Sequence, residues 1–92
     1  MTVTLTGTLR CATSDEADRV RAALAEHIAL TRAEPGCISF SVTPTDDPLV
    51  WAVAEEFEDP AAFEAHQSRA AASSWAEQTR GIARDYTVTG MS

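Results

Sequence analysis

Residues 49–58 constrain the fold most, because they predict a strand whose two faces are both apolar. The apolar residues divide between the faces as Trp51, Val53 and Phe57 on one and Val50, Ala52 and Ala54 on the other. Such a strand needs cover on both sides of its sheet. Helices of the same chain cover one side, so a second copy of the chain over the other side is favoured. A solvated outer face is the alternative, because the other strands carry Thr and Ser there.

Three more strands and three helices are expected around this segment. Alternation predicts strands over residues 2–10, 37–43 and 85–90. Helical spacing and capping signals predict helices over residues 13–34, 60–70 and 73–82. The order β-α-β-β-α-α-β predicts an α+β, ferredoxin-like split βαβ fold with one four-stranded antiparallel sheet and helices on one face. Residues 1–92 fit one domain and no more.

The second strand is expected to begin directly after the first helix. Residues 35–36, Pro-Gly, end that helix at Glu34, because proline disfavours a helical residue before it. The alternation that follows places Ile38, Phe40 and Val42 together on one face of the strand.

Net charge narrows the range of partners. The chain carries a formal charge of −7. An acidic surface is repelled by phosphate backbones and anionic lipids, so neither nucleic acid nor a membrane is an expected partner. The first ten residues lack the basic leader and apolar run of a signal peptide, and no window reaches the ~20 apolar residues of a membrane span. We expect a cytoplasmic protein.

Three segments resemble the antibiotic biosynthesis monooxygenase family. Residues 34–40, E-P-G-C-I-S-F, match its E-P-G-C-[LI]-x-[YF] segment. Residues 53–59, V-A-E-E-F-E-D, are similar to its third strand, where a glutamate precedes an aromatic residue and an acidic helix cap. Residues 61–66, A-A-F-E-A-H, match its A-A-[FL]-x-x-H run. With Trp75, the matches extend over residues 31–86 in family order and spacing.

The resemblance implies a dimeric α+β barrel, a homodimer whose two sheets face each other, with a pocket between sheet and helices in each protomer. Characterised relatives oxidise quinols or anthrones with O2 and use neither metal nor flavin, whereas others degrade haem. It therefore implies a small aromatic substrate, O2 as co-substrate and no cofactor.

Other kinds of site have less support in the sequence. His27, His66, Cys11 and Cys37 are widely dispersed, so no metal site is expected. The four glycines are scattered singly, so no phosphate-binding loop is present. Haem-degrading relatives carry a Trp where this chain has His66 and an iron-binding His near Trp75, which makes haem degradation the weaker alternative.

His66 is the candidate catalytic base, because histidine titrates near neutral pH and this one lies on the inner face of the short helix. A structural histidine that ties helix to sheet is the alternative. The candidate substrate-binding residues are the aromatic, histidine and arginine side chains expected around the pocket: Phe40, Trp51, Phe63, Trp75, Tyr86, His27 and Arg84. Each aromatic residue serves equally well as core, and His27 as core or pocket lining. Glu55 is interpreted as structural, needing an arginine partner if it is buried at the dimer seam.

Two functions follow. The first is a cofactor-independent monooxygenase that oxidises a quinol- or anthrone-type substrate with O2. The second is a non-catalytic small-molecule-binding domain of the same fold, since fold alone does not settle function.

Overall fold

The computed structural model describes residues 1–91 and has the predicted order of elements. The strands are β1 (Val3–Arg10), β2 (Cys37–Pro44), β3 (Val50–Phe57) and β4 (Ala83–Thr89). The helices are α1 (Ser14–Arg32), α2 (Pro60–Ala71) and α3 (Ser74–Gln78).

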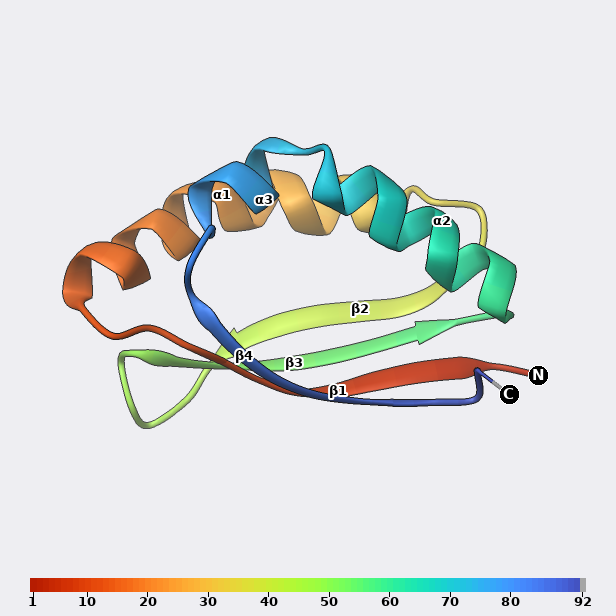
Figure 1. Ribbon diagram of the computed structural model, residues 1–92, viewed down its shortest axis with the longest axis horizontal. Helices are drawn as coiled ribbons and strands as arrows, with labels where there is room; N and C mark the ends of the chain where they lie inside the picture. The colour runs from red at the N-terminus through yellow and green to blue at the C-terminus, as the bar shows by residue number, and fades with distance from the viewer. Residues whose placement is uncertain (92) are drawn as a thin grey trace.

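The four strands form one antiparallel sheet in the order β2-β3-β1-β4. All three helices lie over the same face of this sheet, and the opposite face carries no helix (Figure 1). The predicted α+β, ferredoxin-like split βαβ architecture is confirmed.

Short polar side chains start the helices where the sequence predicts. The Thr13 hydroxyl accepts a hydrogen bond from the backbone N–H of Glu16, and the Asp59 carboxylate accepts one from the N–H of Ala62. Each bond satisfies a backbone donor that the first helical turn would leave unpaired. The last helix is shorter than predicted. It ends at Gln78, where the hydroxyl of the next residue, Thr79, donates to the Trp75 carbonyl and the chain turns toward β4.

The expected alternation of β2 is wrong at its first residues. The pairing with β3 shifts register between Cys37 and Ser39, so Ile38 stands outside the regular ladder. Its side chain is 53% exposed, whereas Phe40 and Val42 are buried on the inner face as predicted. A bulge inserts one extra residue, and that residue loses its place in the two-residue period.

The space between helices and sheet is filled at both ends. At one end Phe57 and Phe63 pack edge to face, with ring centroids 5.7 Å apart, beside Val3. At the other end Leu9 and Val20 are fully buried. These apolar contacts hold the helical layer on the sheet at two separate places.

The middle of the inner face lacks a large side chain on β1. Gly7 pairs with Tyr86 of β4 and has φ +155°, a region that favours glycine. A Cβ there would lie 2.0 Å from the Asp85 carbonyl oxygen, so no larger residue fits. The inner face therefore runs Val3, Leu5, Gly7, Leu9, with a gap at the third position.

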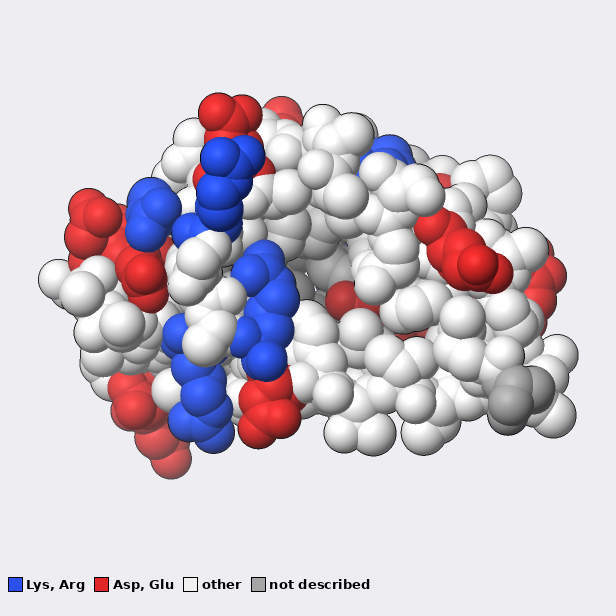
Figure 2. All heavy atoms as spheres, viewed as in Figure 1, with Lys and Arg blue, Asp and Glu red and all other residues white. Residues whose placement is uncertain are grey.

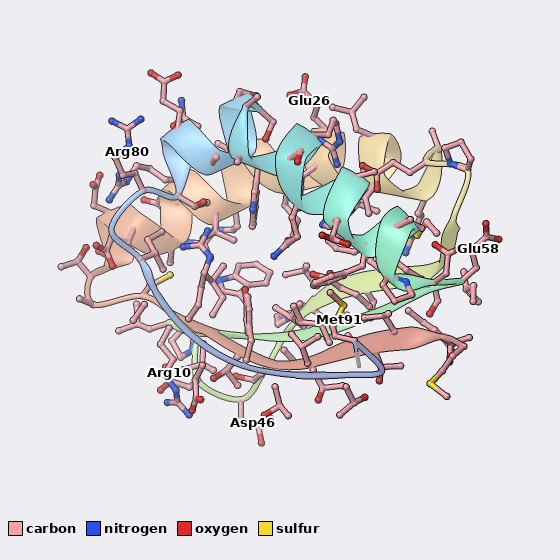
Figure 3. All side chains as sticks on the ribbon, turned by 45° about the vertical axis from the view of Figure 1, so that its right-hand side comes forward. Arg10, Glu26, Asp46, Glu58, Arg80 and Met91 are labelled. Atoms are coloured by element: carbon pink, nitrogen blue, oxygen red, sulfur yellow. The ribbon has the colours of Figure 1, made fainter. Side chains whose placement is uncertain are left out.

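The uncovered face of the sheet is built from small and polar side chains. On β3, Val50 and Ala52 are partly buried and Ala54 is exposed. Figure 3 shows Arg10 on this side of the sheet, away from the helices. None of the helices within residues 1–91 is both long and apolar enough to cross a membrane.

Candidate functional site

A cavity of about 460 Å³ lies between the filled ends of the core. Figure 2 shows a hollow between the helical layer and the sheet, with acidic atoms visible inside it. Its walls come from every helix and every strand: Leu5, His27, Phe40, Val42, Val53, Glu55, His66, Gln67, Ala70, Ala71, Trp75, Ala76, Arg84 and Tyr86. Labelled charged residues of the helical layer such as Glu26 and Arg80 point away from this space (Figure 3).

His66 lies in the wall of this cavity and is held by an ion-paired carboxylate. Its side chain is 3% exposed, and Nδ1 lies 2.9 Å from Glu34 Oε1. The other oxygen of Glu34 accepts from Nε of Arg69 at 2.7 Å. An ionised carboxylate only accepts hydrogen bonds, so the neutral His66 ring carries its proton on Nδ1 and leaves the Nε2 lone pair free.

Arg69 extends this arrangement to the last turn of α1. Its Nη2 donates to the Thr31 hydroxyl at 2.9 Å, and that hydroxyl donates to the His27 carbonyl at 2.7 Å. The contacts join α2, the end of α1 and the Glu34 segment. They therefore fix the His66 ring with respect to α1, on which His27 stands.

Burial lowers the pKa of His66, although Glu34 opposes the shift by its charge and its hydrogen bond. Burial is also the main reason that the pKa of His27 falls to about 3, with the positive charge of Arg69 acting in the same direction. Both rings are therefore neutral at physiological pH, and a neutral imidazole can take up a proton.

Glu55 is the acidic residue inside the cavity. Its side chain is 8% exposed, and Oε1 lies 3.8 Å from Nε2 of His66 with no hydrogen-bond partner within the described residues. Burial, assisted by the charge of Glu34, raises the pKa of Glu55 to about 7. A carboxyl group whose pKa lies near neutrality can act as either acid or base.

Glu55 does not lie on the uncovered face of the sheet, so the condition under which an arginine partner is expected, burial at a dimer seam, does not apply to it. Glu55 pairs with Leu5 and Phe40 across the sheet and faces the helices, not the uncovered side. The signal was present in the sequence, because alternation from Trp51 and Val53 puts residue 55 on the same face.

Aromatic rings form the part of the wall near α3. His27 stacks on Trp75 with ring centroids 4.5 Å apart and an interplanar angle of 3°. Phe40 meets His27 edge-on at 5.2 Å. Flat faces of this kind suit a planar aromatic ligand.

Two polar residues of β4 complete the wall. Arg84 donates to the Thr79 hydroxyl at 2.7 Å and to the Ile82 carbonyl at 2.9 Å, so the turn after α3 holds its guanidinium group in place. Burial raises the pKa of Tyr86, against the lowering effect of Arg84. The Tyr86 hydroxyl is therefore neutral and able to donate a hydrogen bond.

The structure brings most of the predicted site residues to this cavity. The predicted residues that line it are His27, Phe40, His66, Trp75, Arg84 and Tyr86. Trp51 and Phe63 belong instead to the buried core outside the cavity, because β3 places Trp51 opposite Leu9 and Phe63 packs on Phe57. Gln67 and Glu55 also line the cavity and Glu34 contacts His66, although the sequence does not predict these three as site residues. Among residues 1–91, no three His, Cys, Asp or Glu side chains are grouped as metal ligands would be.

Comparison with known proteins gives one family and many similar folds. The family model for antibiotic biosynthesis monooxygenase matches residues 2–78. No curated protein matches the chain in sequence.

Among solved structures, a putative antibiotic biosynthesis monooxygenase from Nitrosomonas europaea has a TM-score of 0.79 at 21% identity, over 98% of this chain and 97% of that one. A second, from Chloroflexus aurantiacus, has a TM-score of 0.78 at 24% identity, over 100% and 94%. SnoaB, a cofactor-independent oxygenase from Streptomyces nogalater, has a TM-score of 0.79 at 13% identity, over 99% and 93%. At these identities the likeness concerns the fold.

Proposed function

Because the chain belongs to the antibiotic biosynthesis monooxygenase family, we propose that it is a cofactor-independent monooxygenase acting on a small quinol- or anthrone-type substrate. One observation carries the proposal. His66 lines a cavity of about 460 Å³, receives its orientation from Glu34, and presents an unprotonated Nε2 to the interior. That is the arrangement of a general base whose tautomer is fixed by a carboxylate.

The reaction begins with proton transfer. The substrate gives a phenolic or activated C–H proton to Nε2 of His66, and the resulting anion is electron-rich enough to pass one electron to O2. Recombination of the two radicals forms a C–O bond. In the net reaction one oxygen atom enters the product, and the other leaves as water with two hydrogens of the substrate.

The cavity supplies the remaining requirements. His27 and Trp75 stack on each other, so a planar substrate packs against the parts of these rings that remain open to the cavity. Arg84 and Tyr86 offer donors that stabilise the negative charge as it develops. Because these donors are held by the fold before the substrate arrives, little reorganisation is needed during the reaction.

A second candidate is a non-catalytic small-molecule-binding protein. It is favoured by the same His66–Glu34–Arg69 contacts, because they also join helices and so would be kept for structural reasons alone. The two functions differ in whether the free Nε2 takes up a proton.

Oxygen consumption with a panel of quinols and anthrones, in chelator-treated buffer, tests the proposal. We expect His66→Ala to reduce the rate by about 100- to 10,000-fold, the range typical of a general base. Glu34→Gln keeps the shape but removes the charge that fixes the ring, and we expect roughly tenfold slower turnover. Glu58→Gln, an exposed glutamate outside the cavity, is the matched control and should behave as wild type.

Two results would contradict the proposal. One is wild-type oxygen uptake no higher than the uncatalysed rate with every substrate, which leaves the binding protein. The other is a folded His66→Ala variant that retains the wild-type rate. Circular dichroism of each variant separates lost chemistry from lost structure.

We also propose a homodimer formed through the uncovered face of the sheet. Ala52 and Ala54 of β3 provide small, apolar surface on this face, where no helix covers the sheet (Figure 1). Ala54→Arg should then convert the dimer to a monomer in sedimentation experiments, because an arginine cannot be accommodated between two close sheets. A wild-type protein that sediments as a single chain at all concentrations would refute this assembly.

A further inference from the structure

Glu55 and His66 leave two polar atoms side by side in the cavity wall. Glu55 Oε1 and His66 Nε2 are 3.8 Å apart, which is too far for a direct hydrogen bond. One oxygen atom at about 2.8 Å from each would close a triangle on that base. Glu55 Oε1 itself has almost no accessible surface, but both side chains line the cavity, so a hydroxyl group in the cavity can lie within reach of the Glu55 carboxyl group and of His66.

We propose that Glu55, in its neutral form, donates a hydrogen bond to the substrate hydroxyl oxygen whose proton His66 removes. This inference rests on the proposed function and makes it more specific, because it requires an aromatic substrate with an ionisable hydroxyl group. It also makes Glu55 a specificity-determining residue that touches the substrate.

The proton count at the two residues is balanced. The O–H bond of the substrate breaks, and its proton forms an N–H bond at Nε2 of His66. The imidazolium is stabilised by the Glu34 carboxylate at Nδ1, 2.9 Å away. The phenolate oxygen keeps the electron pair and accepts the hydrogen bond from the Glu55 carboxyl group, which keeps its own proton.

An ionised Glu55 could not perform this role. A carboxylate has no proton to donate and would repel the phenolate that forms beside it. The walls around Glu55 favour the neutral form, because Phe40 and Val53 are apolar and its Oε1 has no partner. Consistent with this geometry, the pKa of Glu55 is raised to about 7.

The titratable and charged groups that face Glu55 come from both layers. They are His27 of α1, Glu34 after α1, Cys37 of β2, His66 of α2, and Arg84 and Tyr86 of β4. Among them the charge of Glu34 raises the pKa of Glu55, in the same direction as burial. Burial lowers the pKa of both histidines, away from neutrality, so Glu55 is the group expected to change charge near pH 7.

Ligand binding without oxygen tests this role separately from catalysis. The probes are 2-naphthol and its methyl ether, 2-methoxynaphthalene, measured by calorimetry under nitrogen at pH 6 and pH 8. The naphthol hydroxyl resembles that of tyrosine, with a pKa near 10, and stays largely neutral. If only neutral Glu55 binds, the wild-type Kd for naphthol should rise about tenfold between these pH values, following the neutral fraction of a group with a pKa of about 7.

Substitutions identify the residue responsible. Glu55→Gln donates an N–H at every pH, so its Kd should be the same at pH 6 and pH 8. Glu56→Gln, on the opposite face of the sheet, is the matched control and should keep the tenfold change. Glu55→Met provides no polar contact from residue 55 and should bind naphthol weakly at both pH values.

The inference is overturned if Glu55→Gln keeps the wild-type pH dependence, or if wild type binds naphthol and the methyl ether equally well. These results are independent of turnover. A protein that binds naphthol as described but never consumes O2 loses the proposed function and keeps the hydroxyl site. A protein that consumes O2 equally well with and without Glu55 keeps the function and loses this inference.

Discussion

The two ends of the interlayer core differ sharply from its middle. At the ends, Val3, Phe57, Leu9 and Val20 have no exposed surface and contact other apolar side chains. In the middle, the same two layers enclose a cavity whose wall includes Glu55 and two histidines. The difference begins at single positions along β1, where Leu9 fills the space above the sheet and Gly7 does not.

This contrast indicates how the fold divides stability and function. Well-packed apolar ends supply the favourable free energy of burial. A buried acid without a hydrogen-bond partner opposes folding, and such groups are kept mainly where they serve a site. The ends therefore stabilise a middle that is costly to maintain.

Matched truncations on β1 should give the largest effect. Leu9 and Leu5 lie on the same strand and the same face, but Leu9 is in the filled end and Leu5 lines the cavity. We expect Leu9→Ala to lower the free energy of unfolding by about 4–5 kcal/mol and Leu5→Ala by only about 2 kcal/mol, since a new void in close packing adds to the lost burial. Urea unfolding measures both values.

If Leu9→Ala and Leu5→Ala lower the free energy of unfolding by the same amount, the distinction between well-packed ends and a hollow middle is wrong. If Leu9→Ala does not fold, the milder pair Leu9→Val and Leu5→Val makes the same comparison. The decisive result is whether truncation at position 9 lowers the free energy of unfolding more than truncation at position 5.

The pH dependence of stability should show the next largest effect. Folded Glu55 keeps its proton up to about pH 7, whereas an exposed glutamate loses it near 4.5. Between these values the folded state binds more protons than the unfolded state, so stability falls as the pH rises. Complete ionisation of Glu55 in the folded protein lowers the free energy of unfolding by roughly 3 kcal/mol at most.

Urea unfolding of wild type and Glu55→Gln at pH 4.5 and pH 8 isolates this contribution. The difference in unfolding free energy between the two proteins should grow in favour of Glu55→Gln as the pH rises. A constant difference would show that Glu55 ionises in the folded protein as it does in water, and that the middle of the core is not costly in this way.

The sequence predicted the fold because the signals for it are local. Alternation, helical spacing and residues such as Thr13 and Asp59 act through neighbours in the chain, and the structure has the elements they predict. The prediction was wrong at Ile38, because a bulge depends on how two strands pair.

The sequence predicted which kinds of residue form the site, but it did not predict every residue of the site. Aromatic and histidine residues on inner faces could be named, and His66 and Trp75 both line the cavity. Trp51 has the same chemistry and lies in the filled end. No local pattern distinguishes a ring that fills space from one that borders a hollow.

The sequence by itself determined the order of the elements, the inner faces of the strands and the chemical groups available for a site. Only the tertiary structure decided that Glu34, distant in sequence, holds His66, and that Glu55 stands 3.8 Å from the same ring without a partner. The physical reason is that periodicity tells which way a side chain points. Burial, pKa and hydrogen bonding depend on what other elements place opposite it.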